Sequence, residues 1–301
     1  AFGWRSIFYL CVPLGTLAYL VSIAKFKGEW ADAKGESFDW QGSLIYACSI
    51  LLLITGASNL DQGFWAWGLA AAGIIGLALF LIFEGRIEYP VLNVGLLRDN
   101  RIFALSNLAA LFNYAATFGV TFFLSLYLQY VKGMSPQQAG TVLIVQPIMQ
   151  AVLSPACGRL ADYYPAERVA TAGMLLCIIG LGVASTLTAG SSLTMIIVTL
   201  IFLGVGFALF SSPNVSVIMG SVPQRYLGVA SGLSSSMRTL GMMTSMTIIT
   251  IIFSILMGDS PVTAETQIEF LASMRVALLV FCALCAIGIF CSMGRFRGVM
   301  K

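Results

Sequence analysis

The 301-residue sequence contains no histidine, and only 10% of its residues are charged. Histidine is the commonest metal ligand and the commonest general base near neutral pH, so the chain lacks the usual residue for both tasks. A soluble domain has about 25% charged residues, whereas 58% of this chain is hydrophobic. The composition therefore excludes a cytosolic enzyme, a secreted disulfide scaffold and a nucleic-acid-binding protein, and it predicts a protein embedded in lipid.

Neither the net charge nor the cysteines indicate a further binding or redox function. A formal charge of +3 is too small to indicate a nucleic-acid partner, and all seven cysteines lie within or beside apolar stretches. Cys282 and Cys285 form a CxxC pattern, which in a soluble protein can indicate a redox or metal site. Because their neighbours are apolar, we expect small buried side chains, no disulfide, no metal and no cofactor.

Nine stretches are long and apolar enough to cross a bilayer, which takes about 20 residues for a hydrocarbon core of about 30 Å. They cover about 7–24, 41–58, 64–83, 104–128, 139–157, 169–189, 193–217, 229–256 and 273–294. The stretches are continuously apolar and too long for the alternating strands of a membrane barrel. The sequence therefore predicts an all-α membrane protein.

The lysines and arginines predict the orientation of these spans. If residues 25–40 face the cytoplasm, twelve of the sixteen basic residues lie on the cytoplasmic side, as the positive-inside rule requires. The C-terminus is then cytoplasmic and the chain begins outside. No initiator methionine or charged leader precedes the first span. Two interpretations are open: the chain is part of a longer protein, or it is a genuine nine-span protein.

Five short motifs follow one another along the chain. They read GWRSIFY (3–9) with VPLG (12–15), FDWQG (38–42), LRDNRIFA (97–104), GRLAD (158–162), and VP (222–223) with GVASG (228–232), MR (237–238) and Gly241. In this order and spacing the motifs resemble the fourteen-span drug/proton antiporter group of the major facilitator superfamily. The resemblance covers the whole chain and implies that superfamily's all-helical fold.

The resemblance also implies a domain organisation. Residues 1–40 correspond to the last span of an N-terminal bundle with a cytoplasmic linker, 41–100 to two extra linker spans with a cytoplasmic loop, and 101–301 to a six-span C-terminal transport bundle. The first five spans are then missing from this chain. In the superfamily two six-helix bundles rock around a central site, so the missing bundle is expected to be a partner and to carry the acidic residue that couples protons.

The GRLAD motif resembles the superfamily's cytoplasmic signature, which implies a cytoplasmic latch formed by Gly158, Arg159, Asp162 and Arg168. The family pattern usually continues with several basic residues, whereas here DYYPAER (162–168) retains one late base. We expect Asp162 to lie in a loop, to cap the amides of the next helix and to pair with Arg159 or with a basic residue on a neighbouring helix. The alternative is an ordinary solvated aspartate.

Arg238 is a charged residue inside a predicted span. It lies about nine residues into the span that begins near residue 229, where a charge is costly and usually faces a bundle interior or an aqueous cavity. Polar and sulfur-containing side chains share its helical face: Ser231, Ser234, Ser235, Met242 and Ser245. Arg238 therefore either faces a cavity and contacts an anionic group, or extends its side chain towards the cytoplasmic headgroups.

Amides and a tyrosine supply further candidates for the substrate cavity. Gln146 and Gln150 share one helix face beside Pro147, Asn113 and Tyr114 lie with Thr117 in another span, and Asn214 follows Pro213. These side chains suit recognition of an amphipathic solute, but amides also hydrogen-bond neighbouring helices together. Phe118, Phe122 and Phe123 either stack on aromatic solutes or face lipid and core.

Three functions follow from these observations. The first is proton-coupled export of drug-like amphipathic compounds across the inner membrane of a prokaryote, with lipid, a small molecule and protons as partners. The second is export of an anionic physiological solute such as a siderophore or metabolite, which Arg238 favours. The third is a non-transporting membrane subunit or membrane enzyme. An enzyme is not expected, because the sequence shows no catalytic constellation at membrane depth: it has no histidine, and the spans contain no paired carboxylates and no serine elbow.

Overall fold

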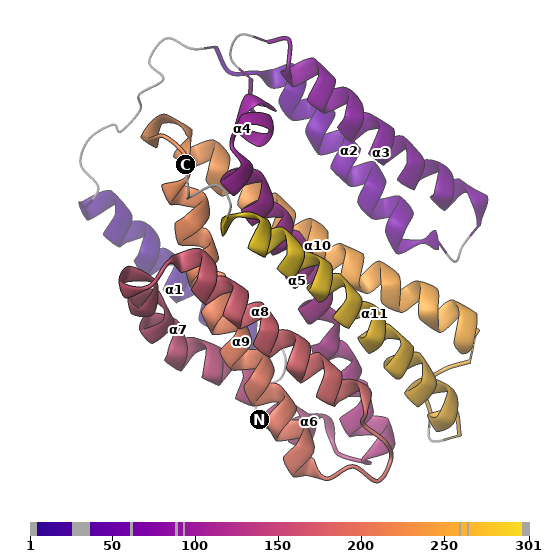
Figure 1. The fold of residues 1–301 in the computed structure, drawn as a ribbon. Coiled ribbons are helices and arrows are strands. Elements are labelled where there is room, and N and C mark those ends of the chain that lie inside the picture. The colour runs from indigo at the N-terminus through magenta and orange to yellow at the C-terminus, as the bar shows by residue number, and fades with distance from the viewer. Residues whose placement is uncertain are drawn as a thin grey trace. The chain divides into compact units, whose positions relative to one another are not determined.

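The computed structural model describes residues 5–25, 37–60, 63–87, 90–92, 94–258, 260–263 and 265–296, and within these ranges it contains helices and no strand (Figure 1). The all-α prediction is confirmed. The chain divides into two compact units, 1–37 and 38–301. The first unit contributes α1 (Arg5–Lys25), a helix of 21 residues with Pro13 inside it, and it is described by itself.

The second unit begins with a helical hairpin of α2 (Trp40–Ser58) and α3 (Phe64–Glu84). Asp39 begins α2 as its N-cap, because its Oδ1 accepts a hydrogen bond of 2.8 Å from the backbone N–H of Gly42. Glycines allow the two helices to approach closely: a Cβ at Gly56 would overlap the backbone of Ala70 in α3. Such small-residue contacts are typical of helices that pack within lipid.

The remaining helices form the bundle that carries the candidate site (Figure 1). They are α4 (Val94–Asp99), α5 (Arg101–Leu126) extended by the π-turn η2 (Tyr127–Val131), α6 (Pro136–Leu143), α7 (Val145–Tyr163), α8 (Ala166–Ser185), α9 (Leu193–Gly220), the short 3₁₀ turn η3 (Gln224–Tyr226), α10 (Leu227–Leu256) and α11 (Gln267–Gly294). α5 packs against both α10 and α11, while α9 packs against α7 and α8.

Eight helical segments among the described residues are long and apolar enough to cross a membrane. They match eight of the nine predicted spans, and the ninth lies in α1, whose apolar part is shorter by the same measure. One predicted span differs in shape: 139–157 is two helices, α6 and α7, that meet at Ile144. Pro147 lacks the N–H that would bond the Leu143 carbonyl, so the regular ladder is incomplete there.

The bundle core contains a cluster of aromatic rings and a close contact between α8 and α9 that a glycine permits. Phe123, Phe253 and Phe270 form a cluster with ring centroids 5.6 to 6.3 Å apart. At Gly206 of α9 an added Cβ would lie 2.8 Å from Cys177 of α8, so only glycine permits this approach. Gly228 and Gly232, four residues apart on α10, differ: a Cβ at either would meet nothing within 4 Å among the described residues.

Candidate functional site

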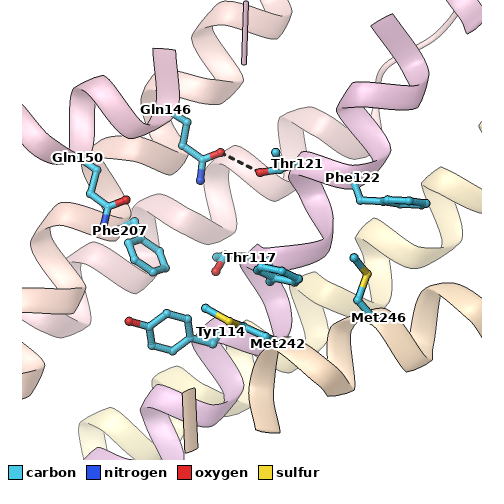
Figure 2. A pocket seen from close by; sticks show the side chains of 10 residues that line it. Tyr114, Thr117, Thr121, Phe122, Gln146, Gln150, Phe207, Met242 and Met246 are labelled. Atoms are coloured by element: carbon cyan, nitrogen blue, oxygen red, sulfur yellow. Dashed lines mark hydrogen bonds between the residues drawn. The ribbon is translucent and has the colours of Figure 1, made fainter. Parts of the chain in front are cut away.

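Two cavities lie side by side in the bundle because Tyr114 of α5 lines both. The larger cavity has a volume of about 310 Å³ and receives side chains from α5, α7, α9 and α10 (Figure 2). Its lining residues are Tyr114, Thr117, Phe118, Thr121, Phe122, Gln146, Gln150, Phe207, Met242 and Met246. Aromatic, thioether and amide groups thus converge on one volume, as Figure 2 shows.

The polar groups of the larger cavity are few and partly engaged. The Thr121 hydroxyl donates a long hydrogen bond of 3.4 Å to Gln146 Oε1 (Figure 2), and the Thr117 hydroxyl donates to the backbone carbonyl of Asn113 at 2.8 Å. The Tyr114 and Phe207 rings meet edge to face with centroids 5.2 Å apart. A mostly apolar wall with a few oriented polar groups is typical of sites for amphipathic small molecules.

The second cavity, of about 200 Å³, is polar and contains Arg238. Its wall comprises Ala110, Tyr114, Phe210, Ser211, Asn214, Val215, Met219, Ser231, Ser234, Ser235 and Arg238. Arg238 is exposed and interacts with the Tyr114 hydroxyl. A guanidinium with serine hydroxyls around it forms a set of donors suited to an anionic group. Ser245, expected on the same polar stripe, instead accepts a hydrogen bond from Gly119 N–H at 2.9 Å and is buried against α5.

A second arginine, Arg295, is completely buried at the end of α11, and the sequence did not predict its burial. Its Nη1 donates to Ser106 Oγ at 3.0 Å and to Asn214 Oδ1 at 2.7 Å, while Nε donates to the Ser292 carbonyl at 3.1 Å. Nη2 donates to the Ser292 hydroxyl. Burial lowers the pKa of Arg295 to about 10, so the guanidinium remains charged at neutral pH. It ties α11 to α5 and α9.

The side chains of the two candidate asparagines, Asn113 and Asn214, mainly contact other helices of the bundle. Asn113 is buried, does not line either cavity, and faces α11, where its Oδ1 lies 4.0 Å from Cys285 Sγ. The structure therefore corrects its expected place: the side chain points into the α5–α11 interface. Asn214 lines the polar cavity, but its amide is engaged twice, since Oδ1 accepts from Arg295 and Nδ2 donates to the Ser106 carbonyl at 3.2 Å.

The predicted latch residues lie on a helix rather than in a loop. α7 runs to Tyr163 and therefore contains Gly158, Arg159 and Asp162. The next helix begins after Pro165 without a side-chain cap, so Asp162 does not cap it as expected. Asp162 and Arg168 are exposed, as is Arg159. The helix continues past the motif because the sequence after the glycine contains no residue that stops a helix before Pro165.

The comparison with known families decides the superfamily. The profile of the Major Facilitator Superfamily matches residues 106–297, which is most of the bundle. The chain belongs to the major facilitator superfamily. Because eight helices in the described part of the chain are long and apolar enough to span a bilayer, it is an integral membrane protein.

Its curated relatives are named as transporters. The riboflavin transporter RibZ of Clostridioides difficile (strain 630) is 32% identical over 240 residues, which cover 79% of this chain and 52% of the relative. The tetracenomycin C resistance and export protein of Streptomyces glaucescens is 27% identical over 263 residues, covering 85% and 48%. The multidrug resistance protein Stp of Mycobacterium tuberculosis (strain ATCC 25618 / H37Rv) is 28% identical over 247 residues, covering 79% and 45%. The chain spans about half the length of these relatives.

Proposed function

We propose that this chain forms the C-terminal nine spans of a fourteen-span secondary transporter that exports drug-like amphipathic compounds in exchange for protons. The observation that carries the proposal is the larger cavity, in which Gln146, Gln150 and Tyr114 are set among aromatic and methionine side chains. Methionine and aromatic walls adapt to varied apolar shapes, and the amides orient a polar end. Relatives named for multidrug resistance and for antibiotic export support this substrate class.

The remaining parts of the proposed transporter follow from the domain organisation. Residues 1–40, 41–100 and 101–301 act as the last span of an N-terminal bundle, a linker hairpin and the C-terminal bundle. The site opens towards an N-terminal bundle that supplies the proton-coupling acid, and the bundles rock by alternating access. The protein lies in a prokaryotic inner membrane with its C-terminus in the cytoplasm, as the basic residues indicate.

Gly158, Arg159, Asp162 and Arg168 form the cytoplasmic latch in this proposal. Gly158 supports this because an added Cβ would lie 3.5 Å from Ser212 Oγ of α9, so the helix end already approaches its neighbour. Arg159 and Asp162 are exposed and lie three residues apart on α7, on one side of the helix. Both therefore present charges to a partner surface rather than to the bundle core.

A second candidate function is export of an anionic solute. The polar cavity favours it, because Arg238 and three serines of α10 line the same volume. A carboxylate there would bind Arg238 while an aromatic body filled the larger cavity beyond Tyr114. The relative named as a riboflavin transporter supports transport of a polar aromatic solute within this family.

The test uses the complete coding sequence, expressed in cells that lack their main exporters. Efflux of a lipophilic cationic dye and of an anionic aromatic dye is followed by fluorescence, with and without a protonophore. We expect efflux that the protonophore abolishes, and a severalfold loss in Gln146→Ala and Gln150→Ala at unchanged membrane levels. Gln137→Ala is the matched control, because Gln137 is exposed on α6 and lines neither cavity.

The outcomes separate the candidates. Preferential efflux of the cation supports drug export, and preferential efflux of the anion supports the second function. Efflux that persists without a proton gradient contradicts proton coupling. If the Gln146 and Gln150 variants export like the Gln137 variant, the larger cavity is not the substrate site.

A further inference from the structure

Two acidic side chains that are far apart in the sequence meet at one end of the α2–α3 hairpin. Asp39 is the N-cap of α2, and Glu84 is the last residue of α3. Glu84 is 2% exposed although it is charged in its free form. Its Oε2 accepts a hydrogen bond of 2.8 Å from the backbone N–H of Leu92. One oxygen of each carboxyl is therefore engaged by backbone: Asp39 Oδ1 by Gly42, and Glu84 Oε2 by Leu92.

The other oxygen of each carboxyl has no such partner. Asp39 Oδ2 and Glu84 Oε1 are both buried, and neither accepts a hydrogen bond from the described residues. A Cβ at Gly42 would overlap both of these oxygens, so they converge on the same small volume above the glycine. The two carboxyls interact with each other directly. A buried oxygen without a partner is costly, and two adjacent carboxylates cannot both remain ionised.

One proton satisfies both oxygens. If one carboxyl carries an O–H, it donates to the carboxylate oxygen of the other, and the pair keeps a single negative charge. That arrangement removes the repulsion and leaves the bonds to Gly42 and Leu92 unchanged. We propose that Asp39 and Glu84 form a binding site for one shared proton, while the second oxygen of Glu84 holds the segment containing Leu92 against the end of the hairpin. The site lies outside both cavities and goes beyond the proposed function.

The charged groups of the packed elements do not replace this proton. α3 has no other charged residue, and α2 has none; its Tyr46 packs on Phe80 with ring centroids 5.1 Å apart. The neighbouring elements bring titratable or charged side chains of their own: Arg86 after α3, Arg98 and Asp99 in α4, Arg225 and Tyr226 in η3, and Arg238 in α10. Among the described side chains, Asp39 is the one that acts on Glu84.

Infrared difference spectroscopy tests the site in the full-length protein reconstituted in lipid nanodiscs. A protonated carboxyl gives a C=O stretching band above the amide region that shifts to lower frequency in D₂O. We expect such a band at neutral pH, and we expect its loss in both Glu84→Gln and Asp39→Asn. In each variant the new amide can donate to the remaining carboxylate, so no proton is needed. The amide oxygen of Glu84→Gln can still accept from Leu92, and asparagine remains a good N-cap.

Asp99→Asn is the control, because Asp99 is exposed on α4 and its removal should leave the band intact. Loss of the band in Glu84→Gln alone, with the band retained in Asp39→Asn, would mean that burial protonates Glu84 without sharing, and the proposal fails. It also fails if no band is present at neutral pH. A band that appears only after Na⁺ or Ca²⁺ is removed would assign a metal cation, not a proton, to the pair.

A second measurement tests the role of the Glu84 side chain in holding the segment that contains Leu92. Glu84→Leu removes the acceptor for Leu92, so hydrogen exchange in a peptide covering residues 90–99 should be severalfold faster than in the parent at the same pH. Glu84→Gln should exchange like the parent, because it retains the acceptor. Equal exchange in these two variants would overturn the role in holding this segment. Neither readout depends on transport, so failure here is distinguishable from failure of the proposed function.

Discussion

Two arginines of the bundle lie on either side of Asn214 and illustrate two different uses of a cation. Arg295 is fully buried, and its donors are satisfied by Ser106, Asn214 and Ser292. Arg238 is exposed in the wall of a polar cavity, together with Tyr114 and three serines of its own helix, α10. A charge whose hydrogen bonds are completed by its own protein stabilises the fold. A charge with donors directed into a cavity is available to a ligand.

The depth of an arginine within a span therefore does not predict whether its side chain is buried or accessible. Arg238 lies deep within α10, yet it is the accessible one. Arg295 comes just after α11, where the positive-inside rule predicts an ordinary cytoplasmic charge, yet the surrounding helices enclose it. Asn214 connects the two, since it accepts from Arg295 and lines the cavity of Arg238. Three substitutions separate the two roles.

The largest effect is expected for Arg295→Ala. It leaves the buried oxygens of Asn214 and Ser106 without their charged donor, and hydrogen bonds to charged groups contribute about 1.5–3 kcal/mol each. We expect a loss of about 3 kcal/mol in the free energy of unfolding, measured by thermal unfolding in detergent. Arg275→Ala on the exposed side of the same helix is the matched control and should change little. Equal midpoints for the two variants would contradict a structural role for Arg295.

A smaller loss is expected for Asn214→Ala. Arg295 keeps its bonds to Ser106 and Ser292 but loses one acceptor, so we expect about 1.5 kcal/mol of destabilisation. The same thermal unfolding assay applies, with Ser211→Ala as the control because Ser211 lines the same cavity without contacting Arg295 in the structure. A loss as large as that of Arg295→Ala would show that the network depends on the amide rather than on the cation.

The smallest effect on stability is expected for Arg238→Ala. Exposed substitutions usually change stability by less than about 0.5 kcal/mol, so the unfolding midpoint should barely move. Binding of an anionic aromatic ligand should weaken by about tenfold or more, because one charge-assisted contact is lost. Arg238→Lys should restore part of that affinity. A marked loss of stability with unchanged anion binding would reverse the assignment of the two arginines.

Most of the fold was predictable because its signal is local. Continuous apolar runs mark membrane helices without reference to their neighbours, and the ends of the predicted spans lie within six residues of the ends of the observed helices. The exceptions also have local causes. The broken span at Ile144 follows from Pro147, and the helical GRLAD segment follows from the lack of a helix-stopping residue before Pro165.

The sequence identifies polar residues that share a helix face, but it does not show which neighbouring helix that face meets. Tyr114, Gln146, Gln150 and Arg238 line cavities, and their roles in substrate binding stay predictions. Asn113, by contrast, faces α11, and nothing in the local sequence indicates which side of α5 meets that helix.

Two features depend on contacts between distant segments. Arg295 is enclosed by residues of α5, α9 and α11, and Asp39 meets Glu84 only because the hairpin brings the start of α2 to the end of α3. The carboxyl pair at the end of the hairpin could not be predicted for this reason. In both cases the sequence contains one recognisable feature: a charged residue at the end of an apolar helix. In the structure a small residue packs against each, Gly42 against Glu84 and Ser106 against Arg295. Only the tertiary packing shows which of these charges become buried.

The junction between α6 and α7 has a mechanical consequence. Pro147 leaves the Leu143 carbonyl without its usual helical donor, so bending at Ile144 breaks no hydrogen bond at that rung. Gln146 and Gln150 lie just beyond this junction and, four residues apart, share one face of α7. A pivot of α7 at this junction would move both amides together, so the width of the larger cavity would change while the two glutamines kept their spacing.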